Sequence, residues 1–191
     1  NNWSCFKNKY HLMKIKKFNF QKVKSTNQTA LRIIKNTNCQ FGVVISEKQT
    51  KGKGQYGKKW ISYKENVCLS FFYKLEKINL PIDLLTKKNC FLVKNVISKY
   101  CKKKINFKPP NDLLINGKKI CGILQEKIEK SKIKFLIVGI GFNLLKNPTI
   151  KNYPTTNLLE VTNKKVNKKS FEKKLIIIFE KFLLKYYKRI K

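Results

Sequence analysis

The sequence predicts a single α/β domain, in which a mixed, largely antiparallel sheet carries helices packed on one face. Short apolar runs that are typical of strands alternate along the chain with stretches of helical periodicity. The dipeptide Asn116-Gly117 is a strong hairpin signal, so the two strands that flank it should be antiparallel. A chain of 191 residues suffices for one domain with a good core, and the sequence has neither an internal repeat nor a visible domain boundary.

The N-terminal part of the domain predicts a strand, a helix and a second strand. Residues 18–23 alternate as a short strand does, and residues 41–46 are typical of a buried strand. The segment between them has apolar residues at helical spacing, which are Ala30, Leu31, Ile33 and Ile34. Ser25 or Thr26 could cap this helix, because a side-chain oxygen accepts hydrogen bonds from the first turn. The stretch 25–27 is therefore either a cap alone or a cap whose hydroxyls and amide also face a ligand.

The next predicted elements are a long strand, a helix and a short strand. Residues 66–75 (NVCLSFFYKL) are strongly apolar, and Pro81 breaks the chain before a helix over residues 84–102. This helix is amphipathic and faces the core with Leu85, Cys90, Leu92, Val93, Val96, Ile97 and Tyr100. Residues 105–107 form a short strand that leads directly to Lys108.

The stretch from 108 to 126 (KPPNDLLINGKKICGILQE) predicts a charged turn followed by a hairpin. Pro109 and Pro110 fix their φ angles and hold Lys108, Asn111 and Asp112 in a stiff geometry. The hairpin strands that follow are residues 113–115 and 120–124. A cation, an amide and a carboxylate at the mouth of a hairpin suggest a site, although an ordinary turn would have the same local pattern.

The last strand of the predicted sheet, residues 133–140, runs into the sequence Gly-Ile-Gly-Phe-Asn. Because Gly139 and Gly141 alternate, one face of the strand lacks side chains there, and a flat ring or another backbone can pack on it. Asn143 should lie at the end of this bare strip. The alternative interpretation of the two glycines is a β-bulge.

Two helices are expected near the C-terminus, after an irregular connection. Thr155 or Thr156 is predicted to cap a short helix that runs through Leu159. Residues 171–187 have the pattern of a final amphipathic helix.

A glycine- and lysine-rich loop, residues 49–60 (QTKGKGQYGKKW), follows the second strand. Gly52, Gly54 and Gly57 let the backbone turn and approach a ligand closely, and the neighbouring lysines add positive charge. Backbone N–H groups and cations together form a cradle for a carboxylate or a phosphate. The loop is neither a Walker loop nor a dinucleotide fingerprint, and a flexible solvated loop is its plain alternative. Trp60, directly after the loop, could stack on a ring.

The formal net charge of +34 raises the question of nucleic-acid binding, because lysines neutralise phosphates. The lysines are spread along the whole chain, and Arg32 and Arg189 are its only arginines. Arginine is the side chain that nucleic-acid recognition favours. A basic nucleic-acid-binding module therefore stays as an alternative function, and a compositional bias is the preferred explanation of the charge.

The cysteines and the hydropathy pattern indicate a reduced, cytoplasmic protein. Six cysteines occur without any C-x-x-C pair, and His11 is the only histidine, so no metal site is expected. No apolar run reaches the length of about 18 residues that a membrane span requires. Residues 1–17 lack the pattern of a secretory signal and are expected to be an N-terminal extension of the domain.

Four stretches in fixed order resemble the catalytic domain of biotin protein ligases. They are S-T-N-Q, G-K-G-Q-Y-G-K-K-W, K-P-P-N-D with K-I-C-G-I-L-Q-E, and G-I-G-F-N. The family has S-T-N, G-R-G-R-x-G-R-x-W, K-W-P-N-D, K-x-x-G-I-L-x-E and G-x-G-x-N. Each piece is weak alone, but the joint pattern is specific and runs from about residue 23 to residue 143, with a weaker match to the C-terminal helix.

The resemblance implies a biotin/lipoate ligase-like fold over residues 18–191 and an ATP-dependent ligase reaction in two steps. The biotin carboxylate attacks the α-phosphate of ATP, and a lysine of a biotin carboxyl carrier protein then attacks the resulting biotinyl-5′-AMP. ATP and biotin are the implied substrates, Mg²⁺ should accompany the ATP, and the carrier would belong to acetyl-CoA carboxylase or a related carboxylase. Members of the family often dimerise through sheet edges, so a homodimer is one expectation for this chain.

The resemblance also implies three sets of site residues. The catalytic residues would be Lys108 and Asp112, with Lys108 near both anions and Asp112 orienting or deprotonating the incoming lysine. The biotin-binding residues would be Ser25, Thr26, Asn27, Gln49, Lys53, Gly54, Gln55, Lys108, Gly122 and Ile123. The residues for ATP and the adenylate would be Gly52, Lys53, Gly57, Lys58, Trp60, Asn111, Gly139, Gly141 and Asn143. Gly139 and Gly141 would let the adenine pack on the backbone, with Asn143 nearby.

The sequence departs from the family pattern at several points. Gln55 stands where the family usually has arginine, and Lys53 and Lys58 also replace arginines. Lysine keeps the charge but loses the bidentate fork, and glutamine loses the charge too. Pro109 replaces the usual aromatic residue. We expect neither an N-terminal DNA-binding domain nor the small C-terminal β-domain of the family. Specific DNA binding is therefore not expected either.

Two further alternatives concern the chemistry. A lipoate or octanoate protein ligase would share the fold but does not usually carry K-x-P-N-D together with the glycine-rich loop. A decayed ligase that binds biotin but turns over poorly would fit the altered loop.

Overall fold

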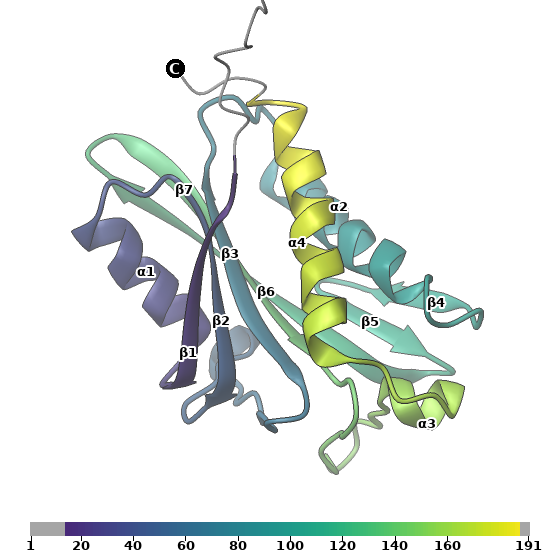
Figure 1. Cartoon of the computed structure of the whole chain (residues 1–191). Coiled ribbons are helices and arrows are strands. Elements are labelled where there is room, and N and C mark those ends of the chain that lie inside the picture. The colour runs from purple at the N-terminus through teal and green to yellow at the C-terminus, as the bar shows by residue number, and fades with distance from the viewer. Residues whose placement is uncertain (1–13, 188–191) are drawn as a thin grey trace, which may run out of the picture.

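Seven strands form one twisted sheet in the order β1-β2-β3-β7-β6-β5-β4, as Figure 1 shows for this computed structural model, which describes residues 14–187. β1 (Lys16–Val23) runs parallel to β2 (Phe41–Gln49), and every other neighbouring pair is antiparallel. The remaining strands are β3 (Val67–Lys74), β4 (Ile105–Lys108), β5 (Asp112–Ile115), β6 (Lys118–Lys130) and β7 (Ile133–Phe142). The predicted fold class, a single α/β domain with a mixed, largely antiparallel sheet, is confirmed.

Helices cover both faces of the sheet, whereas the sequence predicted helices on one face only. Phe71 in β3 stacks on Phe179 with ring centroids 4.0 Å apart, in the larger core under α2 (Ile82–Ile97) and α4 (Lys168–Leu184). The next residue, Phe72, points to the opposite face, where a smaller core forms under α1 (Thr26–Asn36). Figure 1 shows α1 on one side of the sheet and α2 with α4 on the other. β3 is apolar on both faces and therefore has to be covered from both sides.

The turn between β5 and β6 was predicted correctly, whereas the cap of the short helix α3 was not. Asn116 and Gly117 have φ angles of 51° and 73°, which suit the hairpin turn that joins β5 and β6. The short helix α3 (Leu158–Thr162) is capped by Asn157, whose side chain accepts from the Glu160 N–H at 2.8 Å. The predicted caps Thr155 and Thr156 were wrong, because the Thr155 hydroxyl instead donates to the Pro148 carbonyl.

The N-terminal boundary of the domain lies earlier than the predicted residue 18. β1 begins at Lys16, and Ile15 is buried in the larger core. The Ile15 N–H donates to Glu180 Oε1 in α4 at 3.2 Å. The rest of the predicted extension, residues 1–13, lies outside the described residues. Within the described part of the chain, no helix has both the length and the apolar composition to cross a bilayer.

Candidate functional site

A cavity of about 640 Å³ lies over the central strands β6 and β7, on the face of the sheet that carries α1. Its floor contains three glycines, Gly122 in β6 and Gly139 and Gly141 in β7. Gly122 and Gly141 are direct partners across the two strands, and Gly139 pairs with Leu124. The absence of side chains at these positions opens space directly above the sheet.

The bare strip of glycines is covered by side chains of the protein itself. The indole of Trp60 lies on Gly141, where an added Cβ would be 2.3 Å from Trp60 Cε2, and its edge reaches Gly122. Asn27 covers Gly139, where an added Cβ would be 2.2 Å from Asn27 Oδ1. The prediction of a flat ring on alternate glycines therefore describes Trp60. An adenine resting directly on Gly139 and Gly141, as the resemblance implied, would meet these two side chains.

The first turn of α1 forms one wall of the cavity. Ser25 caps the helix by accepting from the Gln28 N–H at 3.5 Å, and Ser25, Thr26 and Asn27 are all buried. Gln49, at the end of β2, accepts from the Thr26 N–H at 2.8 Å and from the Thr26 hydroxyl at 3.0 Å. The stretch 25–27 thus caps the helix and also lines the cavity, so it is not a cap alone.

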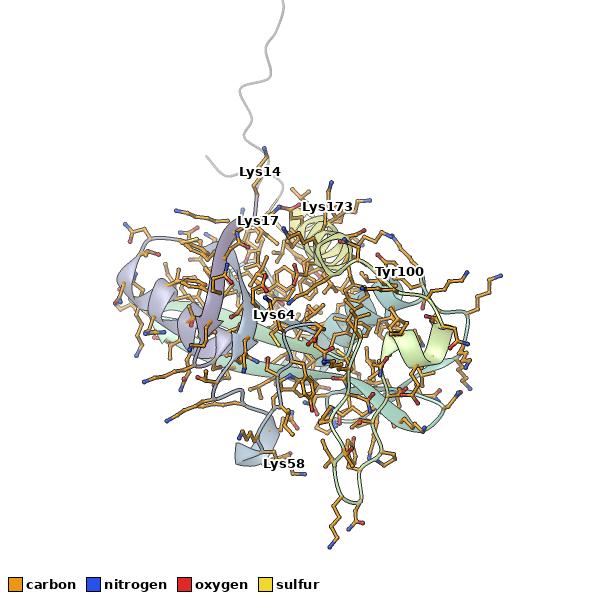
Figure 2. All side chains as sticks on the ribbon, turned by 60° about the horizontal axis from the view of Figure 1, so that its bottom comes forward. Lys14, Lys17, Lys58, Lys64, Tyr100 and Lys173 are labelled. Carbon is orange, nitrogen blue, oxygen red and sulfur yellow. The ribbon has the colours of Figure 1, made fainter. Side chains whose placement is uncertain are left out.

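The glycine- and lysine-rich loop forms a second wall. It closes on itself, because the Trp60 N–H donates to the Gly52 carbonyl at 2.9 Å and the Gly54 N–H donates to the Lys58 carbonyl. Lysines 53 and 58, Gly54, Gln55 and Trp60 line the cavity, and Figure 2 shows Lys58 on this loop, projecting from the body of the domain.

Gly52 and Gly57 do not line this cavity. Gly52 is buried beneath the loop, where an added Cβ would be 2.6 Å from the Trp60 carbonyl oxygen. Gly57 has a φ of +73° and faces a neighbouring cavity of about 440 Å³. Both glycines allow the backbone conformation of the loop. The family motif alone does not tell such a glycine from one that contacts a ligand.

Charged and aromatic groups meet where β4 ends and β5 begins. Lys108 and Asp112 are register partners at the ends of these strands. One Asp112 oxygen lies 2.9 Å from Lys119 Nζ, and the other accepts a 2.6 Å hydrogen bond from the Tyr153 hydroxyl. Lys108 Nζ lies 4.4 Å from the centroid of the Tyr153 ring, and Lys119 Nζ lies 5.4 Å from that of Trp60. These contacts bring Lys108 and Asp112 into one cluster with two residues that were not predicted as site residues.

Tyr153 stays protonated at neutral pH in this cluster. Burial raises the pKa of the phenol, and the hydrogen bond to Asp112 raises it further. The phenol therefore donates to Asp112 and does not compete with it for a proton.

Asn111, Asn143 and Ile123 line the cavity and also brace it. The Asn111 side chain donates to the Ile123 carbonyl at 2.7 Å, and Ile123 donates back to the Asn111 carbonyl at 3.0 Å. Asn143 donates to the Thr156 carbonyl at 3.0 Å and is buried. Both asparagine amides thus hold connecting segments in place beside the cavity.

Sequence reasoning missed Lys119 and Tyr153. Lys119 had a usable signal, because it stands at the lysine of the K-x-x-G-I-L-x-E pattern. Tyr153 had none, since it lies in an irregular connection without periodicity. Other lining residues that were not predicted are Tyr56, Lys59, Ile61, Pro109, Pro110, Leu124, Ile140, Pro148, Ile150, Lys151, Asn152 and Thr155.

The cavity lining is strongly basic. Six lysines line it, and Asp112 is the only acidic side chain among the described residues that does so. A site of this charge favours ligands that carry several negative charges. In the described part of the chain, no three His, Cys, Asp or Glu side chains come together to hold a metal. The donors present suit a divalent cation that a ligand brings with its own phosphates, because Mg²⁺ commonly takes one carboxylate together with phosphate and water oxygens.

Residues 19–143 match the model of the Biotin/lipoate A/B protein ligase family. The chain belongs to this family. The match covers the sheet except for the first three residues of β1, and it covers all the cavity residues named above except the connection that carries Tyr153.

Known members of this ligase family resemble the chain in sequence and in fold. The bifunctional ligase/repressor BirA of Bacillus subtilis is 29% identical over 165 residues, which are 82% of this chain and 50% of BirA. The chain therefore spans about half the length of that curated relative. The fold matches the biotin protein ligase of Aquifex aeolicus in complex with biotin and ATP, with a TM-score of 0.76 and 24% identity over 91% of this chain and 72% of that one. It also matches the biotin protein ligase of Leishmania major in complex with biotinyl-5-AMP, with a TM-score of 0.76 and 19% identity over 90% and 76% of the two chains.

Proposed function

We propose that this chain is the catalytic part of an ATP-dependent biotin–protein ligase. It would form biotinyl-5′-AMP from biotin and ATP and then transfer biotin to a lysine of a biotin carboxyl carrier protein. The observation that carries the proposal is the cavity itself, in which six lysines and one carboxylate surround a glycine floor. Joining a carboxylate to a nucleotide requires a site of this charge, and two solved ligases of the same fold hold biotin with ATP or biotinyl-5-AMP.

In the first step, a biotin carboxylate oxygen attacks the α-phosphorus of ATP, and the bond to the departing pyrophosphate breaks. Negative charge builds up on the phosphoryl oxygens, so fixed cations at that point lower the barrier. We assign this role to Lys108 and Lys119, because both line the cavity and both contact the Tyr153 ring. Mg²⁺ brought by ATP would neutralise phosphate charge, with Asp112 as the carboxylate within reach.

In the second step, the amine of the acceptor lysine attacks the carbonyl carbon of the adenylate, and AMP leaves. The amine must lose a proton, and Asp112 is the only carboxylate among the described lining residues. Both Asp112 oxygens are engaged, one by Lys119 and one by Tyr153. Movement of Lys119 toward the phosphate would free one of them for the acceptor amine. The glycine-rich loop would meanwhile keep water from the activated acyl group.

The proposal also covers the acceptor protein, the cellular location, the extent of the domain and the oligomeric state. The acceptor would be the carrier protein of acetyl-CoA carboxylase or a related biotin-dependent carboxylase, and the reaction would take place in the cytoplasm. The catalytic domain would comprise residues 18–191 together with the buried residues just before them. A homodimer formed through sheet edges would use β1 or β4, which are the outer strands of the sheet.

The distribution of lysines does not favour the alternative of a nucleic-acid-binding module. The lysines that Figure 2 labels lie on well-separated parts of the domain, with Lys14 and Lys58 at opposite ends of the view. A binding stripe would instead gather them on one face.

The proposal is tested by incubating the chain with ATP, Mg²⁺ and radiolabelled biotin, with and without a carrier domain. The expected result is labelled adenylate without the carrier and labelled carrier with it. Lys108→Ala should reduce both by at least about 100-fold, as loss of a transition-state cation does. Lys104→Ala, an exposed lysine outside the cavity, should leave both unchanged. Absence of adenylate from the unaltered chain would refute the proposal.

A further inference from the structure

A short braced loop carries a lysine to the wall of the cavity. The loop is residues 148–153, in the connection between β7 and α3, which Figure 1 shows projecting below the sheet. One end of the loop is tied to β6, because the Lys119 N–H donates to the Pro154 carbonyl at 2.9 Å. The Asn147 side chain donates across the base of the loop to the Thr155 carbonyl at 3.2 Å. The two ends of the loop are therefore held close together beside the cavity.

The tip of this loop is a tight turn with Lys151 at its corner. The Tyr153 N–H donates to the Ile150 carbonyl at 3.2 Å, and Asn152 has a φ of 61°, which asparagine tolerates. Lys151 lines the cavity, is exposed and makes no ion pair among the described residues. Its amine, at the end of a flexible stem, can therefore enter the cavity.

Lys151 also lies beside the carboxylate that we propose as the proton acceptor of the second step. Tyr153, two residues further along the chain, donates a 2.6 Å hydrogen bond to Asp112. Two peptide units span at most about 7 Å between Cα atoms, a distance comparable with the length of an extended lysine side chain. Asp112 is the only acidic side chain in the lining among the described residues, so Lys151 is near the one group that can serve as the base.

The other five of the six lysines in the lining are less suited to accept an acyl group. Lys119 is paired with Asp112 at 2.9 Å, and Lys108 is assigned to the phosphate in the first step. The remaining three belong to the glycine- and lysine-rich loop. None of these three lies within two residues of a side chain that contacts Asp112.

We propose that this chain biotinylates itself on Lys151 when no carrier protein is bound. The inference rests on the proposed function and adds a second acceptor to the same site. The Lys151 ammonium first releases a proton to solvent, and the free amine attacks the carbonyl carbon of biotinyl-5′-AMP. An amide bond forms, and AMP leaves with the electron pair of the broken bond between the acyl carbon and the phosphate oxygen. Asp112 takes the second proton from the nitrogen.

The position of Lys151 gives it an advantage over other lysines of the surface. A nucleophile held on the same molecule as the acyl group reacts with a high effective molarity. Exposed lysines outside the cavity meet only adenylate that has already been released. The expected product is therefore a chain with at most one biotin, attached at one position.

The experiment incubates the full chain with ATP, Mg²⁺ and radiolabelled biotin, without a carrier, and locates the label by mass spectrometry of peptides. The expected result is label on Lys151, at a rate per chain that does not depend on protein concentration. Lys151→Arg keeps the charge but cannot be acylated, because the guanidinium does not give up its proton. This variant should lower the label on the chain by at least about tenfold. Lys104→Arg, at an exposed lysine outside the cavity, is the matched control and should leave the label unchanged.

The amount of adenylate is measured in parallel for each variant, and label per adenylate is the quantity compared. Loss of the first step is thereby separated from loss of the acceptor. Label spread evenly over Lys104 and other exposed lysines would mean that released adenylate reacts at random, which refutes the inference. A rate of labelling at Lys151 that rises in proportion to protein concentration would refute transfer within one chain.

Failure of this inference can be told apart from failure of the proposed function. If the unaltered chain forms adenylate and labels a carrier but never itself, only the inference is refuted. If it forms no adenylate, the proposed function fails, and synthetic biotinyl-5′-AMP decides the inference. Preferential label on Lys151 from the synthetic adenylate supports it, and label spread evenly over exposed lysines refutes it.

Discussion

The hydroxyl of Tyr153 donates a 2.6 Å hydrogen bond to the Asp112 carboxylate, although 41 residues separate them. The contact ties the connection after β7 to the start of β5. Asn66 supports this connection, because its Oδ1 accepts from three successive N–H groups, those of Leu144, Leu145 and Lys146. The carboxylate proposed to receive the acceptor lysine is therefore held from outside its own hairpin.

Tyr153→Phe separates the two half-reactions. The ring that contacts Lys108 is kept, but the hydrogen bond to Asp112 is lost, so Asp112 is less well oriented. We expect transfer to the carrier to slow about tenfold, the equivalent of one hydrogen bond to a charged group, and adenylate formation to stay within about twofold. Single-turnover measurements of each step test this, and an equal loss in both steps would contradict it.

Gln55→Arg tests how well the chain retains its intermediate. Gln55 lines the cavity where the family usually has arginine, and its side chain carries no charge to hold a phosphate. We expect the arginine variant to release biotinyl-5′-AMP about tenfold more slowly, as a charge-assisted bidentate contact would give. Release is followed by trapping free adenylate after one turnover. Gln40→Arg, on the segment before β2, adds the same charge away from the cavity and should change nothing.

Gly141→Ala should displace the Trp60 indole. The added Cβ would be 2.3 Å from Trp60 Cε2, so one of the two must move. Overpacking of this kind costs about 2 kcal/mol in the free energy of unfolding, and urea denaturation measures it. The cost should disappear when Gly141→Ala is made in a Trp60→Ala background, because the clashing ring is gone. A cost that persists there would assign the strain to another neighbour.

Stability should depend on pH through Glu172. This carboxyl is 8% exposed, and its Oε1 has no hydrogen-bond partner among the described residues. Burial raises the pKa of Glu172, with Lys168 acting in the opposite direction. The folded chain thus holds this proton more tightly than the unfolded chain, and its contribution to stability is lost as pH rises through the raised pKa.

Glu172→Gln removes that titration. We expect the variant to unfold at a higher urea concentration than the unaltered chain at about pH 8, where the buried carboxyl is charged. The difference should shrink at about pH 3.5, where the carboxyl is protonated in both states. Glu129→Gln, at the surface, is the matched control. If the variant and the unaltered chain differed equally in unfolding at both pH values, the charge of Glu172 would not be the cause of the difference.

Local signals predicted the strands well, because they depend on neighbours in sequence. The hairpin at Asn116-Gly117 follows from backbone angles that few dipeptides adopt. The face on which α1 lies could not be predicted, since β3 is apolar on both sides and its pattern does not say which helix covers which. The cap of α3 was misassigned because Thr155, Thr156 and Asn157 are all suitable caps, and only tertiary contacts choose among them.

The site residues that were predicted from sequence motifs lie together in the structure. Residues of the cavity that belong to no motif were missed. Ser25, Gln49, Lys108 and Gly141 are far apart in sequence and line one cavity. Tyr153 was missed because its position depends on a connection with no periodic pattern. A motif glycine such as Gly52 could not be assigned from the motif alone, because a motif does not distinguish a backbone role from a contact with ligand.

The cavity combines a floor that belongs to the sheet with walls that mostly belong to connections. The floor lies on β6 and β7, which pair over ten residues, whereas residues 50–61 and 146–155 of the walls lie outside the seven strands. Connections of this kind tolerate substitution and insertion far better than paired strands do. New ligand preferences can thus evolve in the walls while the architecture is inherited unchanged, which is how one family can come to include ligases for both biotin and lipoate.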